Sequence, residues 1–358
     1  MKKHNFSPGP AILPASVMEQ AGKAVVDLDG IGLSILEISH RSAQFVAILE
    51  EAVALTKELL NVPDNYEVLF LTGGASTQFF MTAMNLLNEG ETACYVDTGS
   101  WSTKAIKEAK LFGNIEVVAS SKDKNYSYIP KQFDIPANAK YLHLTSNNTI
   151  FGTEWHKLPI TDLPLVSDMS SDIFSRPIDI ERFSIIYAGA QKNLGPAGTT
   201  MVIVRKDDLG KVQRAMPTML NYNTHIAKNS SFNTPPVFPI YVCMLTLRWL
   251  KERGGVAEMA KYNEEKARIM YEAIDANPCF VGTAEKEDRS WMNATFVMRE
   301  GKEDLEKTFL EHCKAANCEG VKGHRSVGGF RASIYNAMPI ESVQVLAEVM
   351  KAFGEKYG

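Results

Sequence analysis

The sequence predicts an α/β fold: a large domain with a mostly parallel sheet covered by helices, and a smaller α+β domain. At 358 residues the chain is too long for one simple hydrophobic core. From about residue 17 to 260, short β-rich runs alternate with amphipathic segments, which is typical of parallel strands joined by helices. After about residue 260 this alternation ends, which indicates a second unit of different construction.

Seven candidate strands lie in the first part of the chain. Several are near-continuous apolar runs, as expected for strands that are covered on both faces. Between them, Ala75–Leu87 and Thr103–Leu111 show the helical spacing of apolar residues. The predicted strands are Val68–Leu71, Ala93–Asp97, Ile115–Ala119, Tyr141–Thr145, Leu165–Asp168, Ile185–Ala188 and Met201–Arg205.

The second part follows a long helical region that two adjacent glycines interrupt. We expect residues 16–258 to form the large domain, and residues 1–15 and 259–358 to form the small one. The predicted elements here are the helical region Ile240–Asn277 with its break near Gly254 and Gly255, a strand at Thr295–Met298, a helix at Glu303–Ala316, a glycine-rich strand pair around 320–334 and a helix at Ser342–Glu355.

Composition and charge argue against several classes of protein. A net charge of −4 offers no basic surface for nucleic acid or for a membrane. No apolar run approaches the about 18 residues of a membrane span, and no stretch of signal-peptide length precedes Pro8. The five cysteines are an odd number without a CxxC pair, which favours reduced thiols in a cytoplasmic protein. Metal binding is not expected, even at the closest pair, Cys313 and Cys318.

A lysine and an aspartate follow two of the predicted strands. Lys192 comes after the apolar run Phe183–Ala188 among glycine and alanine, so its amine can lie in a tight pocket. A desolvated amine of this kind is neutral and nucleophilic, as pyridoxal 5′-phosphate (PLP) chemistry requires. Asp168 ends another strand, where a carboxylate can face a ligand crevice and hold the PLP pyridine nitrogen protonated. Taken alone, a solvated turn lysine and an N-capping aspartate are the simpler interpretations.

Three further strand ends carry residues suited to a flat, phosphorylated cofactor. Gly73-Gly74 precedes small polar residues that open a helix, so free backbone N–H groups and the Ser76 hydroxyl can bind a phosphate. The turn has neither the P-loop nor the dinucleotide-binding spacing, and taken alone a plain strand–turn–helix with a serine cap is the favoured interpretation. Trp101 can stack on an aromatic ring, and Thr149 offers a hydroxyl, although a lone tryptophan is more often a core residue.

Two His-Arg pairs and a further arginine form a distributed anion-binding set. His40-Arg41, His324-Arg325 and Arg331 lie among glycine, serine and apolar residues and not in solvated charge runs. Arginine binds carboxylate and phosphate as a planar fork. Each pair is weak by itself, because most arginines lie on protein surfaces.

The order of these strand-end residues, together with longer motifs, resembles the phosphoserine aminotransferase family of class-V, fold-type I PLP enzymes. The resemblance runs nearly from end to end. It rests on NFSPGPAILP (5–14), ISHRS (38–42), IYAGAQKNLGPAG (186–198), FNTPPVFPIY (232–241) and KGHRSVGGFRASIYNAMP (322–339).

The resemblance implies PLP as the cofactor and a role for each matching residue. Lys192 would be the Schiff-base lysine and Asp168 the partner of the pyridine nitrogen. The remaining cofactor-binding residues would be Trp101 against the ring, Thr149 at the ring oxygen, Ala75, Ser76 and Gln191 at the phosphate, and Asn233 and Thr234 at the phosphate of the other subunit. A homodimer with composite sites follows from this last pair.

The same resemblance implies the substrates and shows two departures. Arg331 would bind the α-carboxylate, and His40, Arg41, His324 and Arg325 would bind the distal phosphate of phosphoserine or the γ-carboxylate of glutamate. Ser76 stands where many members have arginine, and Pro8 where some have serine, which puts substrate affinity in question. Some members also accept 4-phosphohydroxythreonine, a step of pyridoxine biosynthesis.

Competing interpretations are less consistent with the residues. Alanine–glyoxylate aminotransferase and cysteine desulfurase are the nearest alternatives, but the desulfurase needs a reactive loop cysteine and two His-Arg pairs exceed the needs of a small neutral substrate. A dinucleotide-dependent dehydrogenase lacks its glycine fingerprint here. A catalytically inactive binding module would not need both Lys192 and Asp168.

Overall fold

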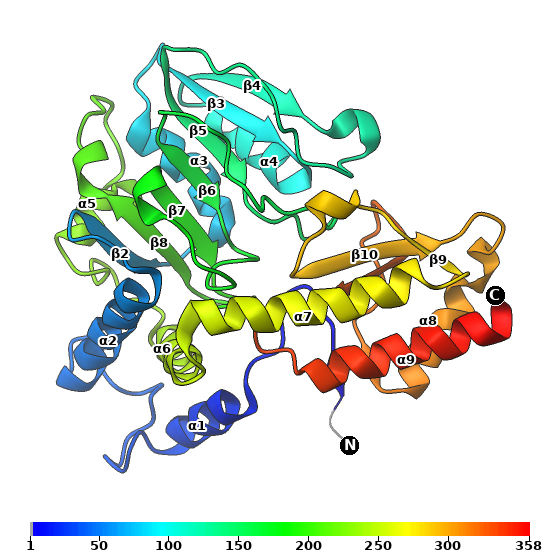
Figure 1. Cartoon of the computed structure of the whole chain (residues 1–358). Helices are drawn as coiled ribbons and strands as arrows, with labels where there is room; N and C mark the ends of the chain where they lie inside the picture. Colours follow the sequence, from blue (N-terminus) through cyan, green and yellow to red (C-terminus); the bar gives the residue numbers. More distant parts are fainter. Residues whose placement is uncertain (1–2) are drawn as a thin grey trace.

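A seven-stranded sheet forms the centre of the molecule, in the order β2-β8-β7-β6-β5-β3-β4 (Figure 1). The structure is a computed structural model that describes residues 3–358, so the first two residues of the expected segment 1–15 lie outside it. All strands but β8 run parallel to one another, and all seven predicted strands are confirmed. Their bounds are β2 Tyr66–Leu71, β3 Thr92–Asp97, β4 Asn114–Ser120, β5 Ala139–Thr145, β6 Leu165–Asp168, β7 Phe183–Gly189 and β8 Thr200–Arg205.

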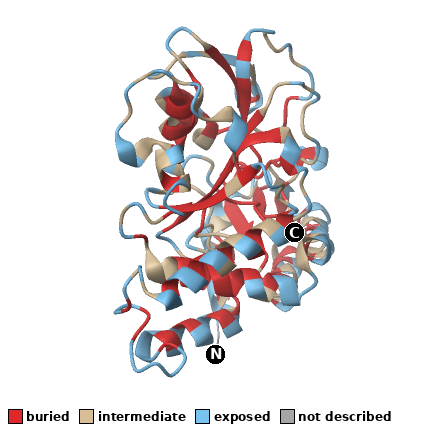
Figure 2. Ribbon diagram, turned by 90° about the vertical axis from the view of Figure 1, so that its left-hand side faces the viewer, coloured by how far each residue is buried: buried red, intermediate tan, exposed pale blue. Residues whose placement is uncertain are grey.

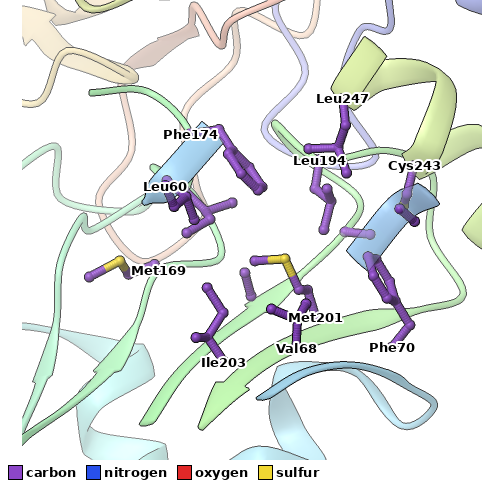
Figure 3. Packing of buried hydrophobic residues seen from close by; sticks show 14 of the residues in the cluster. Leu60, Val68, Phe70, Met169, Phe174, Leu194, Met201, Ile203, Cys243 and Leu247 are labelled. Carbon is purple, nitrogen blue, oxygen red and sulfur yellow. The ribbon is translucent and has the colours of Figure 1, made fainter. Parts of the chain in front are cut away.

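Helices cover both faces of this sheet because its strands are apolar on both sides. In β7, Ile186 and Ala188 belong to one buried cluster while Ile185 and Tyr187 belong to the other, as the alternation of side chains in a strand requires. Helices α1, α2 and α6 pack on the first face, where Phe70, Met201 and Cys243 meet (Figure 3). Helices α3 and α4 pack on the second. Their bounds are α1 Ala15–Val26, α2 Ala43–Leu60, α3 Gly74–Leu86, α4 Ser100–Ala109 and α6 Val237–Glu252, with the short α5 at Tyr222–Ile226.

A second hydrophobic cluster lies beside the large sheet, around the antiparallel sheet β12-β10-β9. Helix α7 runs between the two cores and contributes Met259 to the first and Met270 to the second (Figure 1). Figure 2 shows the central strands buried and the outer faces of the helices exposed, whereas the edge strand β4 is partly exposed. The elements of this part are α7 Gly255–Asp275, β9 Phe280–Gly282, β10 Asn293–Met298, α8 Glu306–Ala315, β11 Cys318–Glu319, β12 Phe330–Ser333 and α9 Ile340–Tyr357.

The strand pair that the sequence predicts around 320–334 does not form a ladder. β11 pairs instead with β1 (His4–Asn5), which ties the N-terminal segment to this region, and β12 pairs with β10. The intervening chain turns back at His324, whose carbonyl accepts from the Gly328 N–H at 2.8 Å. Gly328 and Gly329 have φ angles of +77° and +55°, which strands do not tolerate, so only the bridge between Lys322 and Phe330 remains.

Two negative findings concern residues 3–358. Within that range, no helix combines the length and apolar character required to cross a membrane. The described residues also contain no group of three or more His, Cys, Asp or Glu side chains placed to hold a metal ion.

Candidate active site

A cavity of about 220 Å³ opens at the carboxyl ends of the parallel strands. It forms there because β5, β6 and β7 end side by side, with Thr145 next to Asp168 and Asp168 next to Tyr187 in the sheet register. The cavity brings together nine of the residues that the sequence singles out, from the N-terminal segment to β12. These are Pro8, Ala75, Trp101, Thr149, Asp168, Gln191, Lys192, His324 and Arg331.

Lys192 lies in the turn that follows β7, and its amine is buried in the cavity. Its Nζ donates to Thr149 Oγ1 at 2.7 Å. Gly9 packs against the lysine stem: it has a φ of +146°, and a Cβ there would lie 3.4 Å from Lys192 Cγ. Burial lowers the pKa of Lys192 to about 8, and the nearby Arg331 charge acts in the same direction against the opposing effect of Asp168. The amine is therefore accessible in its neutral, nucleophilic form near neutral pH.

Asp168 ends β6 and faces the same cavity. Its Oδ1 accepts from the Ser170 N–H at 2.9 Å, which fixes the carboxylate at the sheet edge. Burial raises the pKa of Asp168, while the hydrogen bonds from Ser170 and the charge of Lys192 oppose that rise. A buried carboxylate in this position needs a cationic partner, and a protonated ring nitrogen is one.

The cavity wall contains polar atoms that lack a partner within the described chain. Trp101 Nε1, Thr145 Oγ1 and Arg331 Nε are all buried without a hydrogen bond. Because buried polar groups are nearly always satisfied, these three atoms indicate a ligand with several acceptor atoms. A flat, oxygen-rich and anionic molecule such as PLP, together with an amino-acid substrate, fits this set of donors.

The first turn of α3 supplies an anion site beside the ring position. Gly73 has a φ of +100°, and a Cβ there would lie 2.1 Å from Thr77 Oγ1, so only glycine allows this turn. No side chain caps α3, which leaves its first N–H groups and the positive end of its dipole free. Ala75 lines the cavity, whereas Ser76 is exposed beside it.

Two basic side chains, Arg331 and His324, also line the cavity. Arg331, on β12, is 6% exposed and donates through NH1 to the Thr149 carbonyl at 2.9 Å. His324 Nδ1 lies 2.6 Å from Ser326 Oγ. Burial and then the charges of Arg331, Arg325 and Lys104 lower the pKa of His324. Within residues 3–358 none of these four side chains forms an ion pair, so no carboxylate neutralises the charges of Arg331, Arg325 and Lys104 on this side of the cavity.

Four predicted site residues lie elsewhere in the single chain. His40 and Arg41 border a different cavity, of about 550 Å³, between α2, β2 and the chain around 226–231. Asn233 and Thr234 lie in a loop before α6, where Asn233 Nδ2 donates to the Thr234 carbonyl at 3.2 Å. Arg325 is next to His324 but does not line the cavity. One chain alone therefore assembles part of the expected set.

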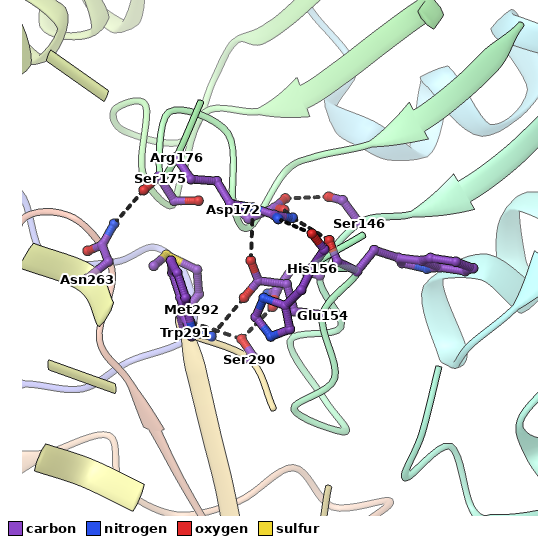
Figure 4. A network of polar contacts seen from close by, with 12 residues as sticks. Ser146, Glu154, His156, Asp172, Ser175, Arg176, Asn263, Ser290, Trp291 and Met292 are labelled. Atoms are coloured by element: carbon purple, nitrogen blue, oxygen red, sulfur yellow. Dashed lines mark hydrogen bonds and ion pairs between the residues drawn. The ribbon is translucent and has the colours of Figure 1, made fainter. Parts of the chain in front are cut away.

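A buried polar network joins the cavity to the smaller sheet (Figure 4). Asp172 accepts from Ser146 Oγ, and the Ser146 N–H donates to the Asp168 carbonyl at 3.0 Å. Arg176 lies 3.7 Å from Asp172 and 3.2 Å from Glu154, and Glu154 accepts from the Trp291 N–H at 2.7 Å. Burial and then the Glu154 charge raise the pKa of Asp172. The network holds the loop after β6 against the segment that leads into β10.

Several residues that line the cavity are not predicted by the sequence alone. Thr145 and Asn147 lie at the end of β5, and Ser170 two residues beyond Asp168. Their positions at strand ends were available as a signal, but small polar residues are too common in such turns to be chosen individually.

The fold and the lysine–aspartate cavity define an aminotransferase of class V, and residues 3–346 match that family. The chain belongs, within this class, to the phosphoserine aminotransferase family. It is 58% identical over 357 residues to the phosphoserine aminotransferase of Parabacteroides distasonis, with 100% of both chains covered.

Solved structures agree with this assignment. The phosphoserine aminotransferase of Bacillus circulans subsp. alkalophilus superposes with a TM-score of 0.96 at 48% identity, over 100% of this chain and 99% of that one. The PLP-bound enzyme of Trichomonas vaginalis gives 0.93 at 38% identity, over 98% and 100%. The chain is therefore a PLP-dependent transaminase of fold type I.

Proposed function

We propose that this enzyme transfers the amino group between phosphoserine and glutamate, with 3-phosphohydroxypyruvate and 2-oxoglutarate as the oxo acids, in serine biosynthesis. One observation carries the proposal. A half-buried, readily deprotonated Lys192 and a buried Asp168 share a cavity whose wall includes His324 and Arg331, neither of which forms an ion pair within residues 3–358. Such a wall suits a substrate with two anionic groups.

Each cavity residue has a proposed role toward the cofactor. Asp168 pairs with the pyridine nitrogen, the Trp101 indole contacts the ring, and Thr149 donates to the ring oxygen. The first turn of α3, with Ala75 and Ser76, holds the phosphate together with Gln191. When bound, PLP supplies an electron sink that stabilises negative charge at the substrate Cα.

The chain's own groups position the substrate and move its proton. The NH1 of Arg331 already donates to the Thr149 carbonyl. The rest of the guanidinium group is therefore the part that binds the α-carboxylate of the substrate. Lys192 would take the substrate Cα proton as a general base, because burial makes its neutral amine readily available. Thr149 Oγ1, which accepts from Lys192 Nζ at 2.7 Å, keeps the amine at the cavity wall between proton transfers.

Turnover with defined amino donors tests the proposed function. We expect purified enzyme with PLP to transaminate phosphoserine with 2-oxoglutarate, and to use alanine or serine with glyoxylate at least about 10²-fold less efficiently, since these lack the distal anion. The measurement is kcat/KM for each donor. Equal efficiency with alanine and phosphoserine would contradict the proposal.

The proposal includes a homodimer in which each subunit completes the other's site. His40 and Arg41 lie away from the cavity of their own chain, yet their side chains match its positive wall in chemistry. Large apolar side chains are exposed around them: Leu33 is 50%, Leu36 62% and Val46 41% exposed. An apolar rim of this kind suits a C2 interface that would carry the pair to the second cavity.

Heterodimers of two inactive variants test the composite site. Lys192→Ala and Arg41→Ala, co-expressed with different tags, are expected to give a heterodimer with about half the wild-type activity, because one of its two sites is intact. The matched control is Lys192→Ala with Asp168→Ala, which leaves no intact site if both residues serve their own chain. Restoration in the control, or none in the first pair, would contradict the arrangement.

Three further assignments belong to the same proposal. Residues 16–258 would form the cofactor domain, and residues 1–15 and 259–358 the small domain that carries Arg331. The absence of disulfides among the five buried, free cysteines supports a cytoplasmic location. The positive wall also suits 4-phosphohydroxythreonine, which has the same two anionic ends as phosphoserine, and hence a role in pyridoxine biosynthesis.

A further inference from the structure

We propose that Lys104 is a specificity-determining residue that favours the doubly charged phosphate of phosphoserine over the singly charged γ-carboxylate of glutamate. The role rests on the proposed function, and it concerns a residue outside the cofactor and α-carboxylate sites. Lys104 lies on α4, next to the cavity wall formed by Trp101.

The position of the Lys104 ammonium group is set by the helix and by the indole. Trp101 and Lys104 are three residues apart on α4, so they lie on the same side of the helix. Lys104 Nζ is 4.4 Å from the centroid of the Trp101 ring. A cation over an indole face is held by electrostatic attraction, which keeps this exposed lysine near the cavity.

The charge of Lys104 acts on the cavity and is not neutralised by the chain. Across residues 3–358, no carboxylate forms an ion pair with Lys104. Burial is the largest cause that lowers the pKa of His324, and the charges of Arg331 and Arg325 come next. The charge of Lys104 adds to these effects. Lys104 lies over Trp101, and Trp101 lines the same cavity as His324 and Arg331, so the Lys104 ammonium group borders the space that these basic side chains share. The positive charges repel one another until an anion binds between them.

An added cation at this position discriminates between substrates by their charge. The Coulomb energy between Lys104 and a ligand is proportional to the charge of the ligand. A phosphate monoester carries nearly two negative charges at neutral pH, and a carboxylate carries one. Lys104 thus stabilises bound phosphoserine about twice as strongly as bound glutamate, in a site where both use the same wall.

Lys104→Met tests this role, because methionine keeps an apolar stem over the indole and removes the charge. We expect KM for phosphoserine to rise about fivefold to tenfold and KM for glutamate about twofold to threefold, with kcat within about twofold. High salt should reduce the difference between wild type and variant, and Lys104→Arg should restore the wild-type KM values. The matched control is Lys107→Met, an exposed lysine of the same helix that does not contribute to the His324 shift.

A titration without turnover provides the second readout. The pKa of His324, followed by NMR in the apoenzyme, should rise in Lys104→Met and stay unchanged in Lys107→Met, because a neighbouring positive charge is removed only in the first. An unchanged His324 pKa together with equal KM changes for both substrates would overturn the inference. Failure of the proposed function would look different: the wild-type enzyme itself would not turn over phosphoserine.

Discussion

Lys192→Ala is expected to abolish transamination, with kcat lowered by about 10³- to 10⁴-fold or more. In the proposed mechanism the variant loses both the covalent link to the cofactor and the general base at Cα, and among residues 3–358 no second lysine lines the cavity to replace them. The visible absorbance of bound PLP should be lost together with turnover. Absorption spectra and single-turnover rates measure the two effects on the same sample.

The fold of this variant is expected to remain intact. Removal of Lys192 takes away a buried amine whose charged form burial disfavours, so the thermal unfolding temperature should not fall sharply. Lys307→Ala, at an exposed position on α8, is a matched control for the loss of a lysine. Retention of wild-type absorbance and turnover in Lys192→Ala would refute the assignment of the reactive amine.

The pH dependence of this amine follows from its lowered pKa. Only the neutral amine attacks an aldehyde, and its fraction rises with pH until the pKa of about 8 is passed. The rate at which apoenzyme gains visible absorbance with PLP should therefore rise from pH 6 and level off above about pH 8. A lysine with its ordinary pKa would give a rate that still increases at pH 10.

Asp168→Asn should produce the second largest effect, a loss of about 10²- to 10³-fold in kcat. An amide has no negative charge to keep the pyridine nitrogen protonated, so the ring accepts electrons less readily. Because asparagine has the same shape, the Ser170 N–H keeps a hydrogen-bond acceptor and the loop should not move.

Asp172→Asn is the informative contrast to this variant. Asp172 is also buried, but its partners are Ser146 and Arg176, and it does not line the cavity. Its replacement should lower thermal stability more than kcat, because it removes one partner of a buried ionic network. If both substitutions lowered kcat alike, Asp168 would have no special relation to the cofactor.

The sequence predicted the sheet and the place of the site because both depend on local patterns. Apolar runs gave all seven strands, and the rule that parallel strands present their carboxyl ends at one edge brought Asp168 and Lys192 together. The sequence patterns did not predict the bounds of helices α1 and α2 or of strand β9. Their packing partners, which decide whether such segments are helical or extended, are distant in the sequence.

The remaining differences arise from contacts that no local pattern encodes. The glycines at 328 and 329 redirect the chain and leave β11 to pair with β1. Glu154 looks like a surface residue by type, yet it is buried because Arg176 and the Trp291 N–H satisfy it. The position of Lys104 over Trp101 likewise becomes visible only in the folded helix.

The ionic network around Asp172 limits how this enzyme can be recombined with its relatives. Its carboxylates and Arg176 belong to the segment 146–176, whereas the Trp291 N–H that completes it belongs to the C-terminal third of the chain. A chimaera that takes only its C-terminal third from a relative keeps this network, provided that the relative's backbone places an N–H group where the Trp291 N–H lies. A donor that shifts this backbone would leave the buried Glu154 carboxylate without the hydrogen bond from the Trp291 N–H, close to the loop that follows Asp168.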